Sequence, residues 1–379
     1  MSKTIERADL SILHIGAGRY SPSDTTHSTF DIWRELSKGF RRYTVVGRST
    51  QPQPAVFADG DVSVRLLSSH MRSEAEFLLT QYKVESVAAE IKPDVVIAQC
   101  PVQGGLLAAR VAKRYGAKVL MEFHMSHYFE EKPLLSRNGI LERITHWNLP
   151  NATRIRVLST GMRERLLVKY GLEFAKRVVV MPPRVDLTRF SRVKKEWNIV
   201  GRPKIVMVGS VNSRKGQLRF LQTILPSRLD VEIWIVGTGP DLDACKSFAE
   251  QTGSIDLVKI FGQMSHTELA NILPRADVMV LFSNMEGTPR AIMEGMAAGL
   301  PIITTNAGFC DDVVEDGVQG FVLGNEPTTE IVECLKRLLS DDEMRARMGR
   351  AARMRAETEF DADKLYNRYR ALIRETAEA

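Results

Sequence analysis

The sequence has few cysteines, and their positions argue against a metal site or a disulfide framework. Among 379 residues there are only four, Cys100, Cys245, Cys310 and Cys334. They lie far apart and form neither a Cys-x-x-Cys pair nor a zinc-binding spacing. No acidic cluster requires a metal either. We therefore expect no metal cofactor, and reduced, mostly buried thiols of the kind found in cytosolic proteins.

Long apolar runs are also missing. No stretch approaches the roughly 20 residues needed to cross a bilayer, and the start, Met-Ser-Lys-Thr-Ile-Glu-Arg, lacks the apolar core of a signal peptide. We therefore expect a cytoplasmic protein. Its 44% hydrophobic and 26% charged residues are those of an ordinary globular chain, and its length suits two domains.

Motifs of two large function classes are missing as well. No Ser, His and Asp arrangement with elbow glycines appears, which disfavours a hydrolase of that kind. The chain has no zinc finger, no interleaving of aromatic and basic residues and no basic tail, so we expect no nucleic-acid partner.

Charge is distributed unevenly over a net value of +6. Residues 1–190 carry 28 Lys and Arg against 19 Asp and Glu, a balance of +9, and the remainder carries 24 against 27, a balance of −3. A basic first half could attract an anionic substrate or the anionic inner face of a membrane. The alternative is that these charges only form an ordinary solvated surface and attract no partner.

Apolar strand-like runs alternate with helical patterns, which is typical of doubly wound parallel α/β layers. A first series predicts strands at 10–15, 43–47, 62–67, 95–98, 118–123, 154–158 and 178–181, with helices at 29–38, 74–91, 104–115 and 160–170. A second predicts strands at 204–208, 231–236, 258–261, 278–282, 302–305 and 321–323, with helices at 215–224, 241–251, 266–273, 290–298, 330–339 and 342–358.

The two series indicate two Rossmann-like domains. We expect a first domain over 1–185, a linker over the polar stretch 186–203, a second domain over 204–360 and a terminal helix within 361–379. Ser265 and Glu268 have the spacing of a capping box, which predicts a helix start.

The segment between strands 278–282 and 302–305 carries the strongest functional signal. Glu286 falls at the carboxyl end of the first strand, where open α/β sheets bind ligands, and Glu294 lies on the following helix. The amides of Gly287, Thr288, Pro289 and Arg290 surround that helix start, and unpaired amides there attract phosphate, although proline itself has no N–H. Two carboxylates beside a phosphate site suit a ligand with sugar hydroxyls around a diphosphate. The alternative is two solvated glutamates on an amphipathic helix.

A second phosphate-type signal follows strand 204–208. Arg214 and Lys215 stand where the next helix is expected to begin, and cations there oppose the helix dipole unless an anion neutralises them. A diphosphate held by Lys215 would resolve this conflict. Two exposed basic residues would be the structural alternative.

Glycine turns follow other strands. Gly16-Ala-Gly18 resembles the start of a dinucleotide fingerprint, but Ser21 replaces its third glycine and no acidic residue is placed to hold a ribose. Gly237 and Gly262 each follow a strand too, and plain turn chemistry explains them equally well.

Two histidines contrast in position. His124 closes the strand 118–123, so it should face the ligand edge of the sheet, and His127 nearby is less well placed. His14 lies within an apolar strand and fits a core residue better.

These features together resemble a family 4 glycosyltransferase of the GT-B fold, with two Rossmann-like domains facing a central cleft. The resemblance covers nearly the whole chain and is tightest over 204–324. It is carried by Val208-Gly-Ser…Arg-Lys-Gly216, Val236-Gly-Thr-Gly-Pro240, Phe261-Gly262, Glu286-Gly-Thr-Pro through Glu294-Gly-Met-Ala-Ala-Gly-Leu-Pro301, and Glu315-Asp-Gly-Val-Gln-Gly320.

The resemblance implies a nucleotide-sugar donor bound mainly by the second domain. Lys215 would hold the diphosphate, Glu294 the ribose and Glu286 the donor sugar, while backbone near Gly262 would meet the base. His124 would approach the sugar, and Gly16 to Gly18 would lie where acceptor and donor meet. The family retains anomeric configuration and usually needs no metal.

Three departures from the family pattern stand out. Ser210 replaces a common arginine, for which Arg214 could compensate; Phe309 follows Gly308 where the family has a second glycine; and Asp312 replaces a glutamate. These changes affect donor identity and pocket shape rather than the fold.

We therefore expect a retaining glycosyltransferase that extends a surface polysaccharide or lipid-linked glycan from a UDP-, GDP- or ADP-sugar, with possible peripheral attachment to the membrane. A sugar-nucleotide epimerase or hydrolase of the same architecture, a non-catalytic nucleotide-sugar-binding protein, and an NAD oxidoreductase are the alternatives.

Overall fold

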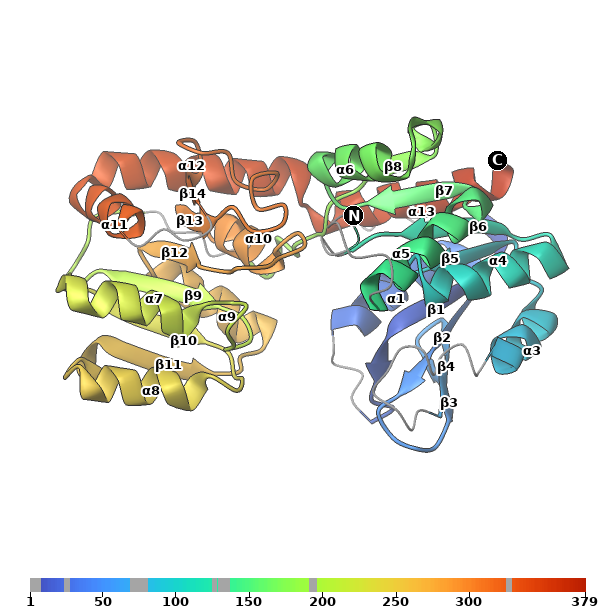
Figure 1. Cartoon of the computed structure of the whole chain (residues 1–379), viewed down its shortest axis with the longest axis horizontal. Coiled ribbons are helices and arrows are strands. Elements are labelled where there is room, and N and C mark those ends of the chain that lie inside the picture. The colour runs from blue at the N-terminus through green and yellow to red at the C-terminus, as the bar shows by residue number, and fades with distance from the viewer. Residues whose placement is uncertain are drawn as a thin grey trace. The chain divides into compact units, whose positions relative to one another are not determined.

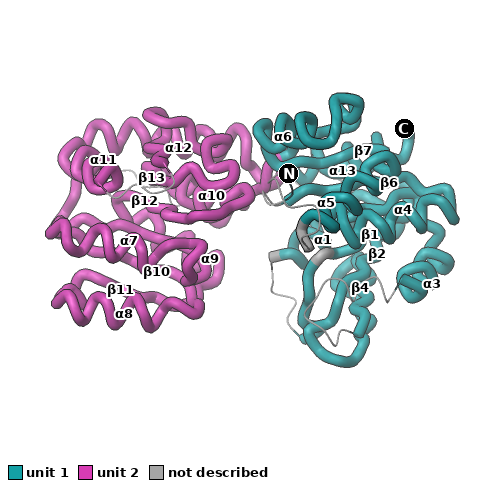
Figure 2. The backbone as a smooth tube through the Cα atoms, in the orientation of Figure 1, with its two compact units in different colours: residues 1–181, 365–379 teal, residues 182–364 magenta. Residues whose placement is uncertain are grey.

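The computed structural model describes residues 8–23, 28–68, 81–124, 128, 137–190, 196–324 and 329–379. It divides into two compact units, coloured separately in Figure 2. Unit 1 contains residues Met1–Met181 and Leu365–Ala379, and unit 2 contains Pro182–Lys364. Each unit is described by itself below.

Unit 1 is built on an eight-stranded sheet with the order β3-β4-β2-β1-β5-β6-β7-β8 (Figure 1). All neighbours pair in parallel except β3 and β4. The strands are β1 (Ala8–Tyr20), β2 (Phe40–Ser49), β3 (Ala55–Asp59), β4 (Val62–Leu67), β5 (Val95–Ala98), β6 (Lys118–Glu122), β7 (Arg154–Val157) and β8 (Val178–Val180). The helices are α1 (Ser28–Ser37), α3 (Gln81–Ile91), α4 (Gln103–Tyr115), α5 (Arg137–Asn148), α6 (Thr160–Tyr170) and α13 (Ala362–Glu378).

Unit 2 is built on a six-stranded, fully parallel sheet with the order β11-β10-β9-β12-β13-β14. Its strands are β9 (Lys204–Val208), β10 (Glu232–Val236), β11 (Val258–Gly262), β12 (Val278–Leu281), β13 (Ile302–Thr305) and β14 (Gly320–Leu323). Its helices are α7 (Gln217–Ile224), α8 (Leu242–Gln251), α9 (His266–Ile272), α10 (Arg290–Ala297), α11 (Glu330–Ser340) and α12 (Asp342–Glu359).

The expected pair of doubly wound α/β domains is confirmed, and most strand positions agree within a residue or two. The capping box is also confirmed, because the Ser265 hydroxyl accepts from the Glu268 amide and the Glu268 carboxylate accepts from the Ser265 amide. Two elements were not predicted: the antiparallel edge strand β3 and the helix α5. Of the helix expected over 74–91, only the part from Gln81 onward lies among the described residues, and His127 lies outside them.

Strand β1 is longer than expected, because it continues through the glycine segment to Tyr20 with a register shift against β2 between Ile15 and Arg19. The Tyr20 ring lies over these glycines. A Cβ atom at Gly16 or Gly18 would stand 3.1 or 3.0 Å from the Tyr20 hydroxyl oxygen, and the Gly18 amide donates to that oxygen at 3.2 Å. Packing against Tyr20 within unit 1 therefore explains why glycine occupies these positions.

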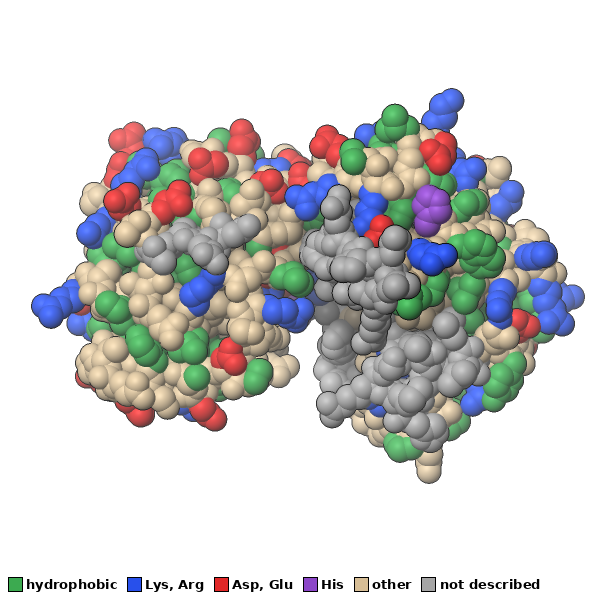
Figure 3. All heavy atoms as spheres, in the orientation of Figure 1, with side chains coloured by type: hydrophobic (Ala, Val, Ile, Leu, Met, Phe, Trp, Pro, Cys, Tyr) green, Lys and Arg blue, Asp and Glu red, His purple; other side chains and the backbone are tan. Residues whose placement is uncertain are grey.

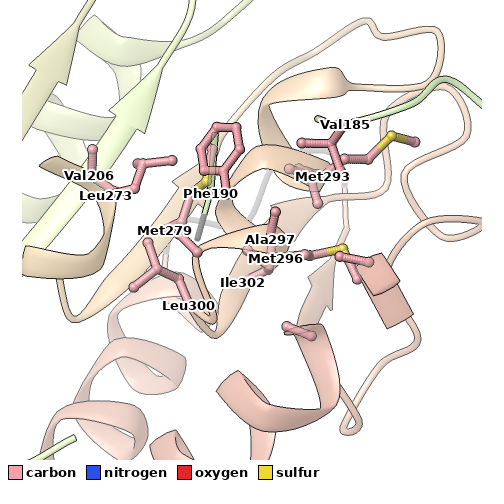
Figure 4. Close-up of a cluster of buried hydrophobic side chains, with 14 of the residues drawn as sticks. Val185, Phe190, Val206, Leu273, Met279, Met293, Met296, Ala297, Leu300 and Ile302 are labelled. Atoms are coloured by element: carbon pink, nitrogen blue, oxygen red, sulfur yellow. The ribbon is translucent and has the colours of Figure 1, made fainter. Parts of the chain in front are cut away.

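The chain after Met181 packs into unit 2. Val185 and Phe190 lie in a buried apolar cluster with Met279, Met293 and Met296 (Figure 4). The Val185 amide donates to the Phe360 carbonyl at 2.8 Å, which ties this entry segment to the end of α12. Phe190 stands within the stretch expected as a linker, yet its side chain is buried in the core of this unit.

The final helix α13 belongs to unit 1 from Leu365 onward, although α12 before it belongs to unit 2 (Figure 2). Its side chains Leu365, Tyr369, Leu372 and Ile373 are buried in the same cluster as Trp33. The Arg370 guanidinium also donates to the Glu35 carbonyl at 2.6 Å. These contacts attach the end of the chain to α1 and the sheet of unit 1.

Two loops approach each other closely at the carboxyl edge of the unit 2 sheet. Gly237 has φ of 139°, and a Cβ atom there would lie 2.0 Å from the Gly209 carbonyl oxygen. Its amide donates to the Gly262 carbonyl at 2.7 Å. Glycine at position 237 is thus required both for its backbone conformation and for the contact between the turns after β9 and β10.

We predict that Gly237→Ala destabilises unit 2 by several kcal/mol, whereas Gly253→Ala costs only about 1–2 kcal/mol. Both positions have positive φ, which costs a non-glycine residue about 1–2 kcal/mol, but an added Cβ at Gly253 meets nothing within 4 Å. Denaturant unfolding of the two variants beside the parent chain measures the difference. Equal losses of stability would contradict the steric explanation.

Candidate functional site

The predicted site residues of unit 2 gather at the carboxyl edge of its sheet. Strand β9 lies between β10 and β12, so the chain crosses to opposite sides of β9 at this point. Such a switch in strand order leaves the loops after the two strands splayed, and ligands bind there in open α/β sheets. The loops in question are 209–216, after β9, and 282–289, after β12.

An ion pair joins these two loops. The Lys215 ammonium lies 2.6 Å from Oε1 of Glu286, and the Ser283 hydroxyl donates to the same oxygen at 2.6 Å. Glu286 is buried and Lys215 is partly exposed. The stem of Lys215 runs beside Gly209, where an added Cβ would stand 3.7 Å from its Cε atom.

The turn after β13 contacts the backbone around Glu286. Gly308 has φ of 69°, and a Cβ there would lie 2.0 Å from the Glu286 carbonyl oxygen. The Phe309 amide donates to the Gly287 carbonyl at 3.2 Å, and the Thr305 hydroxyl donates to the Ser283 carbonyl at 2.5 Å. The backbone around this carboxylate is therefore fixed by β13 and the turn that follows it.

The cations after β9 do not begin a helix as expected. Helix α7 starts at Gln217, with Gly216 as its N-cap residue, and Lys215 lies in the preceding turn, where its amide donates to Asn212 Oδ1 at 3.1 Å. In the described structure the anion that neutralises Lys215 is the carboxylate of Glu286. Arg214 is exposed.

The start of α10 lies next to a buried hydroxyl group. Pro289 is its N-cap residue, and no side chain of the residues that the structure describes caps the helix. Thr288 is buried, and its hydroxyl has no hydrogen-bond partner among the residues that the structure describes. Arg290, the first helical residue, is exposed. A buried hydroxyl beside the start of a helix is a suitable place for an anionic ligand.

Glu294, one turn into α10, is also buried, and its Oε1 lies 3.2 Å from Nδ1 of His266. Both glutamates therefore differ from the alternative of two solvated carboxylates on a helix surface. His266 was not predicted as a site residue. The only sequence signal for it is the capping box, which makes it the first residue of α9.

The remaining predicted residues of unit 2 lie at strand ends and in turns along this edge. Ser210 is exposed, and its carbonyl accepts from Gln217 Nε2 at 3.2 Å. Gly237 and Gly262 are joined by the amide-to-carbonyl bond described above, and an added Cβ at Gly262 would meet nothing within 4 Å.

The other predicted residues, Gly16, Gly18 and His124, belong to unit 1. Gly16 and Gly18 lie in the carboxyl-terminal half of β1 and His124 follows β6, so both lie toward the carboxyl ends of parallel strands. His124 is partly exposed, and its Nε2 lies 2.9 Å from Oε2 of Glu122. Glu122 is fully buried and was not predicted as a site residue, since it stands within an apolar strand.

Histidine 14 is a core residue, as expected. It is buried, its Nδ1 lies 2.7 Å from the Tyr43 hydroxyl oxygen, and burial lowers its pKa to about 4. No group of three or more His, Cys, Asp or Glu side chains among the described residues is arranged to hold a metal ion. Nor does the described part of the chain contain a helix both long and apolar enough to span a membrane.

Comparison with solved structures shows the class of fold. Sucrose-phosphate synthase from Thermosynechococcus elongatus superposes with a TM-score of 0.80 at 18% identity, covering 97% of this chain and 98% of that chain. The Anabaena protein HepE in complex with UDP gives 0.75 at 17% identity, covering 97% and 100%. The protein thus has the GT-B fold.

Sequence comparison identifies the family. Residues 190–355 match the family model "Glycosyl transferases group 1" and residues 26–184 match "Glycosyl transferase 4-like domain". A glycogen synthase of Mycobacterium tuberculosis is 24% identical over 90% of this chain and 81% of its own length. A GDP-mannose-dependent phosphatidylinositol monomannoside mannosyltransferase of the same organism is 28% identical over 65% and 67%. The chain belongs to the group 1, GT4-like glycosyltransferases.

We predict that acid destabilises unit 1 through His14. Its pKa is about 4 in the folded protein against an ordinary 6.5, so the unfolded chain binds the proton more readily and stability falls as pH drops through that interval. Between pH 7 and pH 5 the loss should be about 2 kcal/mol. Denaturant unfolding at both pH values measures it.

The variant His14→Gln should lose most of this dependence, whereas His146→Gln, at an exposed position of the same unit, should keep it. An undiminished slope in His14→Gln would contradict the assignment.

Proposed function

We propose that the protein is a retaining glycosyltransferase that transfers a sugar from a nucleotide-sugar donor to a glycan or lipid-linked acceptor, in surface polysaccharide or glycoconjugate biosynthesis. The observation that carries the proposal is the pair Lys215–Glu286 at the switch in strand order of unit 2. Within the described part of the chain, it stands beside a helix start without a side-chain cap and a buried hydroxyl without a partner.

The geometry suits a nucleoside diphosphate. Lys215 is partly exposed and supplies a positive charge, while the uncapped start of α10 supplies partial positive charge from its amides. Thr288 could donate its hydroxyl to a phosphate or sugar oxygen. Buried Glu294 accepts hydrogen bonds and would hold the two ribose hydroxyls, as the family resemblance implies.

Glu286 has two roles in this proposal. One oxygen is shared by Lys215 and Ser283, which fixes the carboxylate; the other would accept from hydroxyls of the donor sugar. A carboxylate held in this way needs little reorganisation when substrate binds.

Transfer would proceed on one face of the sugar. The bond from the anomeric carbon to the diphosphate oxygen breaks, the acceptor oxygen bonds to the same face, and the departing diphosphate takes the acceptor proton. Lys215 stabilises the charge that develops on the diphosphate, and no metal is required.

The names of similar proteins support a UDP- or GDP-linked donor. HepE has been solved with UDP-glucose, and the mannosyltransferase of Mycobacterium tuberculosis is GDP-mannose-dependent. An ADP-linked donor stays within the proposal, because the residues named above contact the diphosphate and sugars rather than the base.

We predict that Lys215→Ala and Glu294→Ala each abolish measurable donor binding, or weaken it by at least ten- to a hundredfold, because each removes a charge-assisted contact of about 1.5–3 kcal/mol. Isothermal titration calorimetry with UDP-, GDP- and ADP-sugars measures this. Lys246→Ala, at an exposed position of the same unit, should bind like the parent.

Binding of no donor by the intact protein would contradict the proposal. Product analysis with donor alone separates it from the alternatives: an epimerase or hydrolase would convert the donor without acceptor. The anomeric configuration of the transferred sugar, read by NMR, tests retention.

We further propose that unit 1 attaches to anionic membranes through one face of α5 and α6. Each helix exposes an arginine and two apolar side chains at positions i, i+3 and i+7: Ile140, Arg143 and Trp147 on α5, and Arg165, Val168 and, just beyond its end, Leu172 on α6. Lys169 of α6 pairs with Glu142 of α5 at 3.0 Å, so the two helices are neighbours.

Exposed apolar side chains with interspersed cations suit the interface of a bilayer with anionic lipid. Figure 3 shows hydrophobic and basic side chains, with some acidic ones, over α6. The basic balance of the first half of the chain is consistent with this surface.

We predict flotation of the protein with vesicles that contain anionic lipid, reduced at high salt because the attraction is screened. Val168→Glu together with Leu172→Glu should reduce recovery at least about tenfold, while Val200→Glu, an exposed valine of unit 2, should not. Equal recovery on neutral and anionic vesicles would count against the proposal.

A further inference from the structure

A carboxylate inside unit 1 contacts three other side chains. Glu122, the last residue of β6, is only 1% exposed. Its Oε2 lies 2.9 Å from Nε2 of His124. Its Oε1 accepts from Nη1 of Arg156 on β7 at 2.8 Å and from the hydroxyl of Tyr369 on α13. Three segments far apart in the sequence therefore meet at one carboxyl group.

The charge of this carboxylate is maintained despite its burial. Burial alone would raise the pKa of Glu122, but the Arg156 guanidinium and His124 hold it well below its ordinary value. Arg156 is itself buried, donates to the Met181 carbonyl at 3.3 Å, and stacks over the Tyr369 ring at 4.7 Å. His14 also faces this group from β1, and its lowered pKa leaves it neutral near pH 7.

An ionised carboxylate only accepts hydrogen bonds. The contact with His124 therefore places a proton on Nε2 of the imidazole, and in the neutral ring the other nitrogen, Nδ1, carries a lone pair. The side chain of His124 is 31% exposed, and among the described residues Glu122 is its one hydrogen-bond partner. The ring is thus held by one nitrogen from inside the unit.

We propose that Glu122 is a positioning residue that fixes the orientation and tautomer of His124, and that Arg156 and Tyr369 hold Glu122 in place for this purpose. The inference rests on the proposed function and on the family resemblance, which implies that His124 approaches the donor sugar. It adds that Nδ1 of His124 is the ring atom presented to the sugar.

Helix α13 also takes part in positioning His124, through Tyr369. Tyr369 lies in this final helix, yet its hydroxyl contacts the carboxylate that orients a histidine after β6. Its ring is buried in the core of unit 1 and covers Arg156. The end of the chain therefore contributes to positioning His124 as well as to the packing of the unit.

The direct test is the NMR spectrum of the full chain with ¹⁵N-labelled histidine, without donor. The parent should show a downfield, slowly exchanging Nε2–H signal, assigned to His124 by its loss in His124→Asn. That signal should disappear in Glu122→Gln and stay in Glu90→Gln, which removes an exposed carboxylate of the same unit. A parent spectrum with the proton on Nδ1, or an unchanged signal in Glu122→Gln, would overturn the proposal.

Kinetics supplies a second readout. Glu122→Gln should lower kcat by about ten- to a hundredfold, the range found when hydrogen-bond partners that orient a metal-binding histidine are removed, with a much smaller change in KM for the donor. Tyr369→Phe keeps both charges and one of the two contacts to Oε1, so a smaller loss is expected. A change in donor KM alone would contradict a role in orienting His124.

Because Glu122→Gln leaves the buried Arg156 without its counter-charge, it could fail to fold. The double variant Glu122→Gln, Arg156→Met removes both charges and should show the same missing signal. Failure of the proposed function has a different signature: the parent would transfer no sugar, while the NMR signal of His124 would still depend on Glu122.

Discussion

Each unit depends on the compensation of a buried carboxylate at the carboxyl end of a parallel strand. A charge removed from water costs several kcal/mol unless it is paired and hydrogen-bonded. Glu286 meets this condition through Lys215 and Ser283, and Glu122 meets it through Arg156, Tyr369 and His124. In both cases the donors come from separate segments, so the carboxylate fixes how loops and strands meet.

The two carboxylates differ in which of their partner side chains is exposed to solvent. In unit 2 the pair stands between two loops, and the Lys215 side chain is 23% exposed. In unit 1 the charge is enclosed and only the histidine beyond it reaches solvent. The first arrangement suits ligand binding, and the second suits orientation of a group that binds.

Much of the fold could be predicted because it follows from local patterns. Apolar runs located the strands, and the spacing of Ser265 and Glu268 located a helix start. The edge strand β3 was missed because its side chains alternate between partly buried and exposed positions, and α5 because its polar and apolar residues are mixed. The contact of Tyr20 with its own glycine segment depends on packing that no spacing reveals.

Some residues of the candidate site could also be predicted from the sequence, and others could not. Glu286 follows a strand and Glu294 lies on a helix, as predicted, whereas Lys215 lies in the turn before α7 rather than at the start of a helix. Glu122 could not be found in this way, because its partners Arg156 and Tyr369 are brought to it only by the sheet order and by the return of α13. His266 beside Glu294 likewise depends on how α9 packs near α10. Such pairings are properties of the tertiary structure, since each joins residues distant in sequence.

The central claim is that the loops after β9 and β12, with the start of α10, hold the diphosphate of an activated sugar. Hydrogen–deuterium exchange tests it most directly, with a saturating donor chosen by thermal shift. We predict slower exchange in peptides that cover residues 209–217 and 284–294, and little change in peptides from α8 and α11 of the same unit. Unchanged exchange in these two loops, with a donor shown to bind, would contradict the claim.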